Sequence, residues 1–544
     1  MPALTETARI VVLNPVDNVA IAVRDLSESA TVSAAGVSAL RTTSAVPQGH
    51  KVALRPIATG QPVVKFGQTI GFATKAIAAG DWVHAHNLAM NDYQRDYAFA
   101  KETPPDPAPI TGRTFMGYRR ADGRVATRNY IGIIATVNCS NAVSKAIVRE
   151  FSRQALRDFP NIDGVVAFTH ATGCGMQYGG MHHQILNRVM AGFARHPNIA
   201  AYLVIGLGCE VATTGALAKA GNLVDLRIDI AGGNGSAQAT GGAPEQSRSS
   251  MLAARHSPLA PVAMTMQDMG GTRKTIDRGI ELVKEMLPAA NRVTRVPIPA
   301  SEIILATKCG GSDGNSGITA NPALGVASDA IVACGGTSIL GETTEIYGAE
   351  HLLTRRAKTQ AVGMKLVEKI KWWEWYTGVF GASIDNNPSP GNKAGGLTTI
   401  YEKSLGAVAK GGTAPLSAVY DYAEQVAPHR GFVIMDSPGF DPAVVTGMVA
   451  GGANVICFTT GRGSCFGYKP VPSIKIATNT PMYERLIDDM DFNAGTILEG
   501  ASVQQVGEAM FELILDVASG KKTKSEEMGL GDEEFVPWYL GPVV

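Results

Sequence analysis

The chain has 544 residues, and its 48 lysines and arginines balance 48 aspartates and glutamates, so the formal net charge is zero. Hydrophobic residues make up 45% and charged residues 18%, which is the balance of a folded globular protein and excludes a disordered chain. Because a neutral chain has no electrostatic preference for nucleic acid or an anionic membrane, we expect neither as a partner. The length is too great for one hydrophobic core and predicts about three domains.

The N-terminus and the cysteine content predict a protein of the reducing cytoplasm. The opening MPALTETARI lacks the basic start and the apolar core of a secretion signal. No apolar run approaches the roughly 20 residues that a membrane helix needs. The seven cysteines are therefore expected to be free thiols or metal ligands rather than disulfides.

The first 115 residues divide into a β-rich module and a linker. Over residues 1–100, short alternating runs such as KVALRPI and PVVKFG are separated by Gly, Pro and Asp turns, which predicts a small all-β domain. Over residues 101–115, the prolines of KETPPDPAPITGR predict an extended linker without a helix.

The rest of the chain alternates apolar runs with helical patterns and predicts an α/β fold with mostly parallel sheets. Residues 116–300 contain the helical segments NAVSKAIVREFSRQAL and MHHQILNRVMAGFARH. Residues 301–544 contain the strand candidates EIILAT, GTSILG, GFVIMD and NVICFTT. The small, polar and aperiodic residues 231–262 predict a surface loop or a lid.

Four cysteines follow apolar runs and precede glycine- or serine-rich turns: Cys139, Cys174, Cys209 and Cys309. The first three stand at equal intervals of 35 residues, which matches the roughly 30 or more residues of one βα unit. If their strands share one parallel sheet, the four thiols gather at its carboxyl edge, where open α/β sheets bind ligands. Thiolates suit soft metals and iron–sulfur clusters. The alternative, that each cysteine is a small buried hydrophobe, stays open.

Glycine-rich turns concentrate the remaining polar chemistry. The chain has no GxxxxGK[ST], no GxGxxG between a strand and a helix, and no GxSxG, which argues against a nucleotide cofactor and a serine hydrolase. His170 follows a strand and is a candidate base or ligand, or else a structural histidine of the turn. Lys393 and Arg462 stand beside glycines and are candidates to bind carboxylates, or else solvated surface residues. In the β module, His50 and the alternating pair His84 and His86 are candidates for a ligand site or a polar surface.

The motifs CGGSDGNSGITANP, NPSPGNKAGG with the following EKSLG, FTTGRG and GYRRADGRVATRN resemble the altronate/galactarate dehydratase family. In the N-terminal module, DNVAIAV, PQGHKVAL and HAHN resemble that family's β-clip (SAF) domain. The resemblance covers nearly the whole chain. HAHN, SGITANP, NKAGGLTT and GAEHLL are closer to the altronate branch. The stretch SCFG at 464–467, where the family pattern predicts Thr-Pro-Tyr-Gly, and a long 231–262 loop depart from the family.

The resemblance implies four parts: a SAF domain at 1–100, a linker at 101–115, a middle domain at 116–300 that forms a homodimer and part of the active site, and a Rossmann-like catalytic domain at 301–544. It also implies dehydration of a sugar acid with Fe²⁺, for which Mn²⁺ can substitute in vitro, or with an iron–sulfur cluster. Relatives of the family include a sulfo-lyase.

The resulting hypothesis is a hydro-lyase that removes water from a D-altronate-like aldonate by β-elimination. A base takes the proton next to the carboxylate, the 3-hydroxyl leaves, and a 2-keto-3-deoxy acid forms. Galactarate dehydration, a sulfo-lyase reaction, an iron–sulfur redox sensor and a non-catalytic sugar-acid-binding protein are the alternatives. We assign catalysis to His170, Lys393 and Asp313, substrate binding to Ser312, Asn321, Asn392, Arg462, His50 and His86, and metal binding to Cys139, Cys174, Cys209, Cys309 and Glu210.

Overall fold

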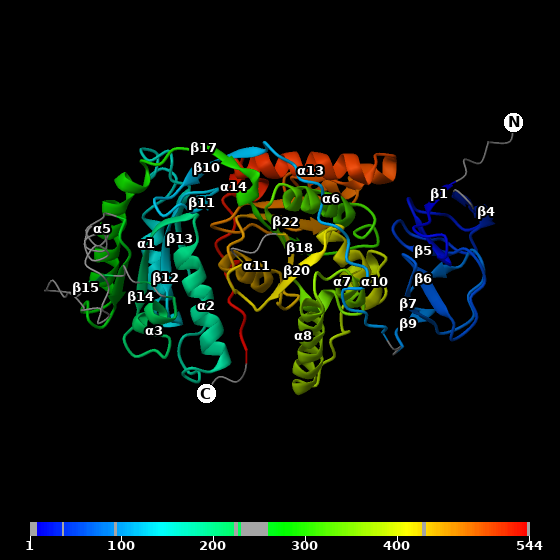
Figure 1. The fold of residues 1–544 in the computed structure, drawn as a ribbon, viewed down its shortest axis with the longest axis horizontal. Helices are drawn as coiled ribbons and strands as arrows, with labels where there is room; N and C mark the ends of the chain where they lie inside the picture. Colours follow the sequence, from blue (N-terminus) through cyan, green and yellow to red (C-terminus); the bar gives the residue numbers. More distant parts are fainter. Residues whose placement is uncertain are drawn as a thin grey trace.

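The computed structural model describes residues 8–34, 37–91, 95–221, 223, 227–229, 259–426 and 431–540. Three bodies lie in a row, with the N-terminal β module at one end, a five-stranded α/β domain at the other and a seven-stranded α/β domain between them (Figure 1). The predicted loop at 231–262 lies outside the described residues except for its last four. Among the described helices, none combines the length and the apolar character that crossing a bilayer requires.

The N-terminal module is all-β, as the sequence predicts. It contains a six-stranded sheet of order β4-β3-β1-β2-β5-β8 and a three-stranded sheet of order β6-β7-β9. Its strands are β1 (Ala8–Val11), β2 (Val19–Ala22), β3 (Thr31–Ala34), β4 (Val37–Arg41), β5 (Lys51–Ala53), β6 (Pro62–Lys65), β7 (Gln68–Ala73), β8 (Trp82–Val83) and β9 (Leu88–Ala89).

The proline-rich linker has no helix and runs along the seven-stranded domain. The backbone N–H groups of Ala100 and Ile110 donate to the carbonyls of Thr354 and Ala333, each at 3.0 Å. The linker ends in a small antiparallel sheet of order β11-β10-β17, which joins the two α/β domains. Its strands are β10 (Thr114–Arg119), β11 (Val125–Ala126) and β17 (Val296–Pro299).

The middle domain is a parallel sheet of order β13-β12-β14-β16-β15. The chain leaves the central β12 to β13 on one side and then returns to β14 on the other, which creates a topological switch point between β12 and β14. Helices α1 and α5 cover one face, and α2 covers the other. The elements are β12 (Tyr130–Ala135), η1 (Asn138–Ser140), α1 (Asn141–Arg149), β13 (Gly164–Phe168), α2 (Met181–Arg195), β14 (Ile199–Gly206), α3 (Thr214–Gly221), β15 (Arg227–Asp229), β16 (Val262–Thr265) and α5 (Thr272–Ala290).

The C-terminal domain is a parallel sheet of order β20-β21-β19-β18-β22-β23-β24, with its switch point between β18 and β22. Helices α6 and α13 cover one face and α11 the other. The strands are β18 (Ile304–Cys309), β19 (Thr337–Leu340), β20 (Leu416–Tyr420), β21 (Gly431–Met435), β22 (Val455–Thr460), β23 (Ser473–Ala477) and β24 (Phe492–Asn493). The helices are η2 (Ala300–Glu302), α6 (Ala320–Ala333), η3 (Thr343–Glu345), α7 (Glu350–Arg355), α8 (Gln360–Val379), α9 (Pro390–Ala394), α10 (Ile400–Ala407), η4 (Val408–Gly411), α11 (Asp441–Ala450), α12 (Thr480–Arg485), η5 (Gly495–Glu499), α13 (Val503–Ala518) and α14 (Lys524–Met528).

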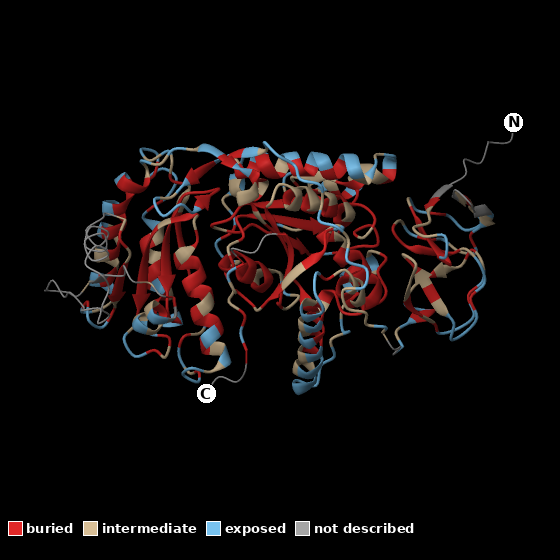
Figure 2. Cartoon of the chain, in the orientation of Figure 1, coloured by how far each residue is buried: buried red, intermediate tan, exposed pale blue. Residues whose placement is uncertain are grey.

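The strands of both parallel sheets are buried, whereas exposed residues line the linker and the outer sides of the helices (Figure 2). Every residue of β12 and of β22 is buried. Strands that are covered by helices on both faces become continuous apolar runs. The expectation of an α/β fold with mostly parallel sheets is therefore confirmed, and the apolar runs were the correct signal for it.

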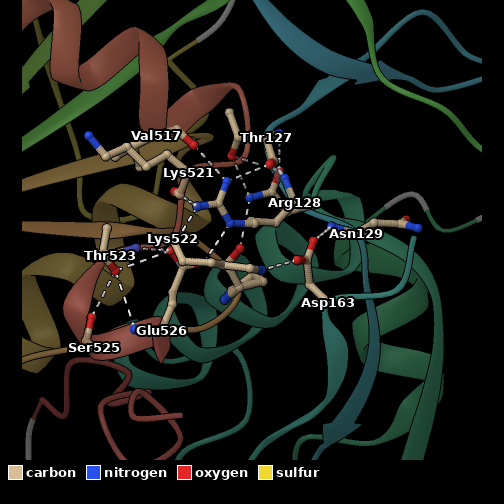
Figure 3. Close-up of polar contacts among 12 residues, drawn as sticks. Thr127, Arg128, Asn129, Asp163, Val517, Lys521, Lys522, Thr523, Ser525 and Glu526 are labelled. Carbon is tan, nitrogen blue, oxygen red and sulfur yellow. Dashed lines mark hydrogen bonds and ion pairs between the residues drawn. The ribbon is translucent and has the colours of Figure 1, made fainter. Parts of the chain in front are cut away.

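A single buried arginine joins the middle domain to the C-terminal helices (Figure 3). Arg128 lies just before β12, and its side chain is inaccessible to solvent. Its Nε and Nη2 donate to the two carboxylate oxygens of Glu526 in α14, at 2.6 and 2.8 Å. The remaining donors reach the carbonyls of Thr127 (2.9 Å), Val517 (2.8 Å) and Lys521 (3.0 Å). All five N–H donors of the guanidinium are thus used.

We expect Arg128→Leu to lower the free energy of unfolding by about 3–5 kcal/mol, because it leaves the buried Glu526 carboxylate without its partner. Urea denaturation followed by circular dichroism measures this change. The control is Lys145→Ala, which removes an exposed ion pair with Glu533 (3.1 Å) and should cost less than about 1 kcal/mol. Equal losses in the two variants would contradict a joining role for Arg128.

Candidate active site

The loops after β18 and β22 meet at the switch point of the seven-stranded sheet. The N–H of Gly310 donates to the carbonyl of Thr459 at 3.0 Å, and the N–H groups of Gly461 and Arg462 donate to Gly311 at 3.1 and 2.9 Å. Because open parallel sheets bind ligands at such a point, this edge is the first place to look for a site. The motifs CGGSD and FTTGRG both lie here.

Asp313 lies on the loop after β18 and is buried. Its carboxylate accepts hydrogen bonds from the hydroxyls of Ser316 (2.9 Å) and Thr478 (3.0 and 3.1 Å) and from the N–H of Asn315 (3.1 Å). Burial raises the pKa of Asp313, although the hydrogen bonds from Ser316 and Thr478 oppose this effect. Asp313 therefore organises the loop and is also a carboxyl group that titrates above the ordinary range of aspartate.

Two of the predicted substrate-binding amides instead hold the loops together. Asn321 donates to the carbonyl of Gly406 (2.9 Å) and accepts from the hydroxyl of Thr459 (2.7 Å). Asn392 donates to the carbonyl of Ser312 at 2.8 Å. The hydroxyl oxygen of Ser312, in contrast, is buried and has no hydrogen-bond partner within the described part of the chain. Ser312 is thus the residue of this set that retains a free polar group for a ligand.

Buried charges surround Cys309 at the end of β18. Lys410 Nζ lies 2.5 Å from a carboxylate oxygen of Glu342 and 2.9 Å from Cys309 Sγ. Lys308 contacts the other oxygen of Glu342, and Lys403 Nζ lies 2.8 Å from Glu345. We call this group the lysine–glutamate cluster; its members are Lys308, Cys309, Glu342, Glu345, Lys403 and Lys410.

The protonation states in the lysine–glutamate cluster follow from burial and neighbouring charge. Burial raises the pKa of the Cys309 thiol, and the Glu342 carboxylate raises it further. Burial also raises the pKa of Glu342, but Lys308 and Lys410 outweigh it and hold that pKa below its ordinary value. At neutral pH, Glu342 is therefore ionised and Cys309 is a protonated thiol.

The lysine–glutamate cluster contains the one group of three metal-ligand types, among the described residues, whose donor atoms lie within 4.8 Å of one another: Cys309, Glu342 and Glu345. Its carboxylates are already neutralised, since three lysines face these two glutamates and Asp441, which lies 2.7 Å from Lys308. A divalent cation would add two positive charges to a balanced set. As arranged, the cluster does not fit a resident divalent metal.

A small cavity of about 10 Å³ lies between the lysine–glutamate cluster and the N-terminal module. Lys65 and Phe66 of the module line it together with Ser312, Asp313 and Lys403. This volume is room for about one water molecule. The cavity is too small for a sugar acid, so the module closes the site in this structure.

The module docks through two lysines on one buried glutamate. Lys51 and Lys65 are buried, and their Nζ atoms lie 2.8 and 2.9 Å from the carboxylate of Glu402 in α10. Burial lowers the pKa of Lys51 to about 8, against the opposing charge of Glu402. Burial raises the pKa of Glu402, but the two lysines outweigh it and hold that pKa well below its ordinary value. A Cβ on Gly314 would lie 2.0 Å from the carbonyl oxygen of Gly49, so the two backbones approach as closely as glycine allows.

The histidines of the module lie at and beside this interface. His50 Nδ1 accepts from Trp82 Nε1 (3.1 Å), and its Nε2 faces the carbonyl of Ala394 (3.3 Å). Burial lowers the pKa of His50, which keeps the ring neutral. His84 stacks on Trp82 with its Nδ1 buried and unpartnered in the described structure, while His86 is exposed. His50 therefore contacts the C-terminal domain, and His86 lies on the surface of the module.

His170 lies in the middle domain, away from the cavity. Its Nε2 donates to the carbonyl of Ala135 at 2.9 Å, and its Nδ1 accepts from the N–H of Thr172 at 3.2 Å. Burial lowers the pKa of His170 to about 4. Both ring nitrogens are thus engaged: Nε2 ties the end of β13 to the end of β12, and Nδ1 holds the loop that follows β13.

The predicted site residues are divided among the three domains. The expectation that four cysteines share one sheet edge is wrong for Cys309, which lies in β18 of the seven-stranded sheet. Lys393 is half-buried beside His50's partner Ala394, and Arg462 is exposed. The C-terminal domain contains Cys309, Ser312, Asp313, Asn321, Asn392, Lys393 and Arg462, the module contains His50 and His86, and the middle domain contains Cys139, His170, Cys174, Cys209 and Glu210.

The sequence analysis missed the buried charges that dominate the site. A signal for them exists, because a lysine within or ending an apolar run, as in GHKVAL, PVVKFG and EIILATK, must find a partner when the strand is buried. The missed residues are Lys51, Lys65, Lys308, Glu342, Glu345, Glu402, Lys403 and Lys410.

Comparison with known proteins decides the family. Domain models match at residues 8–91 (altronate/galactarate dehydratase SAF domain), 117–291 (D-galactarate dehydratase/altronate hydrolase, second domain) and 300–543 (D-galactarate/altronate dehydratase, C-terminal). The chain belongs to the altronate/galactarate dehydratase family. The resemblance drawn from the motifs is thereby confirmed.

Individual relatives match over most of their length. An altronate dehydratase of Bacillus subtilis is 34% identical over 94% of this chain and 95% of its own. A galactarate dehydratase (L-threo-forming) of Escherichia coli is 36% identical over 97% and 96%. The beta subunit of a (2R)-sulfolactate sulfo-lyase of Chromohalobacter salexigens is 30% identical over 78% of this chain and 97% of its own. The first two identities are too similar to separate an altronate branch from a galactarate branch.

We expect the thiols to react in two classes in metal-free protein under anaerobic conditions. Cys139, Cys174, Cys209 and Cys465 are exposed and should be alkylated quickly at pH 8. Cys309 and Cys457 should react only after denaturation, because burial removes access and raises the pKa of both thiols. Mass spectrometry of alkylated peptides reads this out, and rapid labelling of Cys309 in the native protein would contradict its placement.

Proposed function

We propose that this member of the dehydratase family is a hydro-lyase that eliminates water from a sugar acid, with a D-altronate-like aldonate as the first candidate. The observation that carries the proposal is the small cavity at the switch point of the seven-stranded sheet, where the polar residues Ser312, Asp313 and Lys403 meet the closed N-terminal module. We regard the sheet as a Rossmann-like variant, since β18 has β19 on one side and β22 on the other. The order on the β19 side departs from the doubly wound order 3-2-1-4-5-6, because β21 lies between β19 and β20.

The chemistry explains why such a cavity needs buried cations. Removing the proton next to a carboxylate creates an enediolate with additional negative charge, and fixed positive groups in a dry site stabilise it. Lys65 and Lys403 line the cavity and are held by Glu402 and Glu345. When the substrate enters, Lys403 binds its carboxylate and the Ser312 hydroxyl contacts a substrate oxygen, and Lys65 joins them when the module closes again.

Among the three residues assigned to catalysis from the sequence, Asp313 is the best placed to move the proton. It lines the cavity, and burial raises its pKa toward the range in which a general base works. Lys393 and His170 remain proposals without a contact to the cavity. If His170→Asn kept near-normal activity and metal content, the histidine would be eliminated as the base.

We expect Asp313→Asn to lower kcat/KM by about 10²–10⁴, the usual contribution of a positioned acid or base. In the wild type, kcat/KM should fall as the pH drops through the pKa of Asp313, at a higher pH than for an ordinary aspartate, because the base must be ionised. The pH profile of the variant should lack this limb. An unchanged limb in Asp313→Asn would assign the base to another residue.

The proposal includes iron, as Fe²⁺ with Mn²⁺ as a substitute in vitro, or as an iron–sulfur cluster. Such a group supplies a Lewis acid that polarises the leaving hydroxyl and stabilises the enediolate. The lysine–glutamate cluster is charge-balanced and fits this role poorly. The thiols of Cys139, Cys174 and Cys209 are exposed and free, and as soft ligands they fit iron better.

The N-terminal module acts as a lid in this proposal, since a cavity of about 10 Å³ must open before a sugar acid enters. We expect Glu402→Gln to release the module, because two buried ammonium groups would then face a neutral amide. Trypsin should cut the linker at 101–115 faster, and kcat/KM should fall. The control is Lys358→Ala, which removes an exposed ion pair with Asp106 of the linker (2.8 Å). This variant should change neither the rate of tryptic cleavage nor kcat/KM.

The deciding experiment is an anaerobic assay with ferrous iron and reductant. Altronate, galactarate, related aldonates and 2-sulfolactate are offered, and release of 2-keto-3-deoxy acid or sulfite is followed. Product from altronate supports the proposal, product from galactarate or sulfolactate selects one of the alternatives, and no product with iron bound favours the redox alternative. Light scattering of the same sample tests the proposed homodimer.

A further inference from the structure

We propose that Cys139, Cys174 and Cys209 of the middle domain bind an iron–sulfur cluster through three thiolates. The inference deepens the proposed function, on which it rests for its catalytic meaning. Cluster binding itself is measurable without turnover, so the two can fail separately.

The three cysteines occupy equivalent positions in one sheet. Cys139 follows β12, Cys174 follows β13 and Cys209 follows β14, and these strands are neighbours in the order β13-β12-β14. Since the strands are parallel, the three loops leave the same edge. Cys139 and Cys209 flank the switch point between β12 and β14, which is the ligand-binding position of an open parallel sheet.

Hydrogen bonds tie the three loops to one another. The N–H of Asn138 donates to the carbonyl of Thr172 at 2.9 Å, and the N–H of Val211 donates to the carbonyl of Gly173 at 3.0 Å. Gly173 has φ +99°, and a Cβ there would lie 2.3 Å from the carbonyl oxygen of Thr136. Each of the three cysteines is thus within two residues of a backbone contact between its own loop and a neighbouring one.

A buried glutamate stiffens this edge. One carboxylate oxygen of Glu210 accepts from the Thr136 hydroxyl at 3.0 Å, and the other accepts from the N–H of Gly208 at 2.6 Å. Glu210 therefore joins the β12 loop to the β14 loop and is a positioning residue rather than a ligand. The side-chain oxygen of Asn141, which starts α1, is buried without a partner among the described residues, and its amide N–H donates to the carbonyl of His170 at 2.8 Å.

The thiols themselves lack a structural role. All three are exposed and free, although a cysteine that serves as a small hydrophobe is buried. Cys139 lies in η1, directly before α1, and Cys174 and Cys209 lie in the segments that precede α2 and α3. Since helix N-termini favour negative charge, the thiolate of Cys139 is the best placed of the three in the sequence to gain from this effect.

The spacing of the sulfurs distinguishes a cluster from a single ion. A metal ion with sulfur ligands at about 2.3 Å holds any two sulfurs no more than about 4.6 Å apart. Among the described residues, only the Cys309 group has three donor atoms within 4.8 Å of one another, so the three middle-domain thiols span a greater distance. A cluster of bridged irons holds its cysteine sulfurs farther apart than a single ion does, so of the two a cluster is the better match. A four-iron cluster is ordinarily held by four cysteines, so three leave one iron without a cysteine ligand.

The test is anaerobic reconstitution of the full chain with ferrous iron, sulfide and reductant. We expect about four irons and four sulfides per chain, a charge-transfer absorption in the visible range, and protection of the three thiols from alkylation. Cys139→Ser, Cys174→Ser and Cys209→Ser should each lose most of the bound sulfide while retaining the wild-type thermal unfolding midpoint. Cys465→Ser, an exposed cysteine of the other domain, is the matched control and should bind as the wild type does.

The inference is overturned if the reconstituted protein binds iron without sulfide or binds no iron. It is also overturned if Cys465→Ser loses as much bound sulfide as the three middle-domain variants do. A protein that assembles the cluster but dehydrates no sugar acid would refute the proposed function and leave this inference standing. A protein that dehydrates its substrate with full activity in all three cysteine variants, and binds no sulfide, would do the reverse.

Discussion

Burial of the Glu402 carboxylate between two lysines of the N-terminal module is the interaction on which the closed site depends. Buried charges are stabilised only when their partners are present and well placed. The ion pairs of Glu402 with Lys51 and Lys65 therefore form only when the module is docked in this position. Glu402 is followed in α10 by Lys403, which lines the cavity. The same turn of α10 therefore holds the docked module, through Glu402, and places Lys403 at the cavity.

The two parallel sheets create two ligand-binding edges with different chemistry. At the edge of the seven-stranded sheet, lysines balance carboxylates around a protonated thiol, which suits an anionic substrate in a dry cavity. At the edge of the five-stranded sheet, three thiols are exposed and free. Arg128 joins the two domains with four of its five N–H donors, which reach Glu526, Val517 and Lys521 across the boundary.

Much of the fold could be predicted because parallel strands covered on both faces are continuous apolar runs. The runs EIILAT and NVICFTT became β18 and β22, and MHHQILNRVMAGFARH became α2 almost to the residue. The helix predicted over 141–156 ends at Arg149 instead. Phe151 and Leu156 beyond it still pack into the core of the five-stranded sheet, from turns rather than from a helix. Because these apolar residues are buried whether the segment is helical or not, the apolar pattern did not indicate where α1 ends.

The sequence by itself determined the βα units, the equivalent positions of Cys139, Cys174 and Cys209, and the family, because these depend on local periodicity and on contiguous motifs. Only the tertiary structure decided that Cys309 belongs to a different sheet, that Asn321 and Asn392 hold loops, and that buried lysines line the cavity. Lys51 and Glu402 are 351 positions apart, and no local pattern specifies such a pair. A buried charge is stable only beside its partner, and the fold determines which distant residue that partner is.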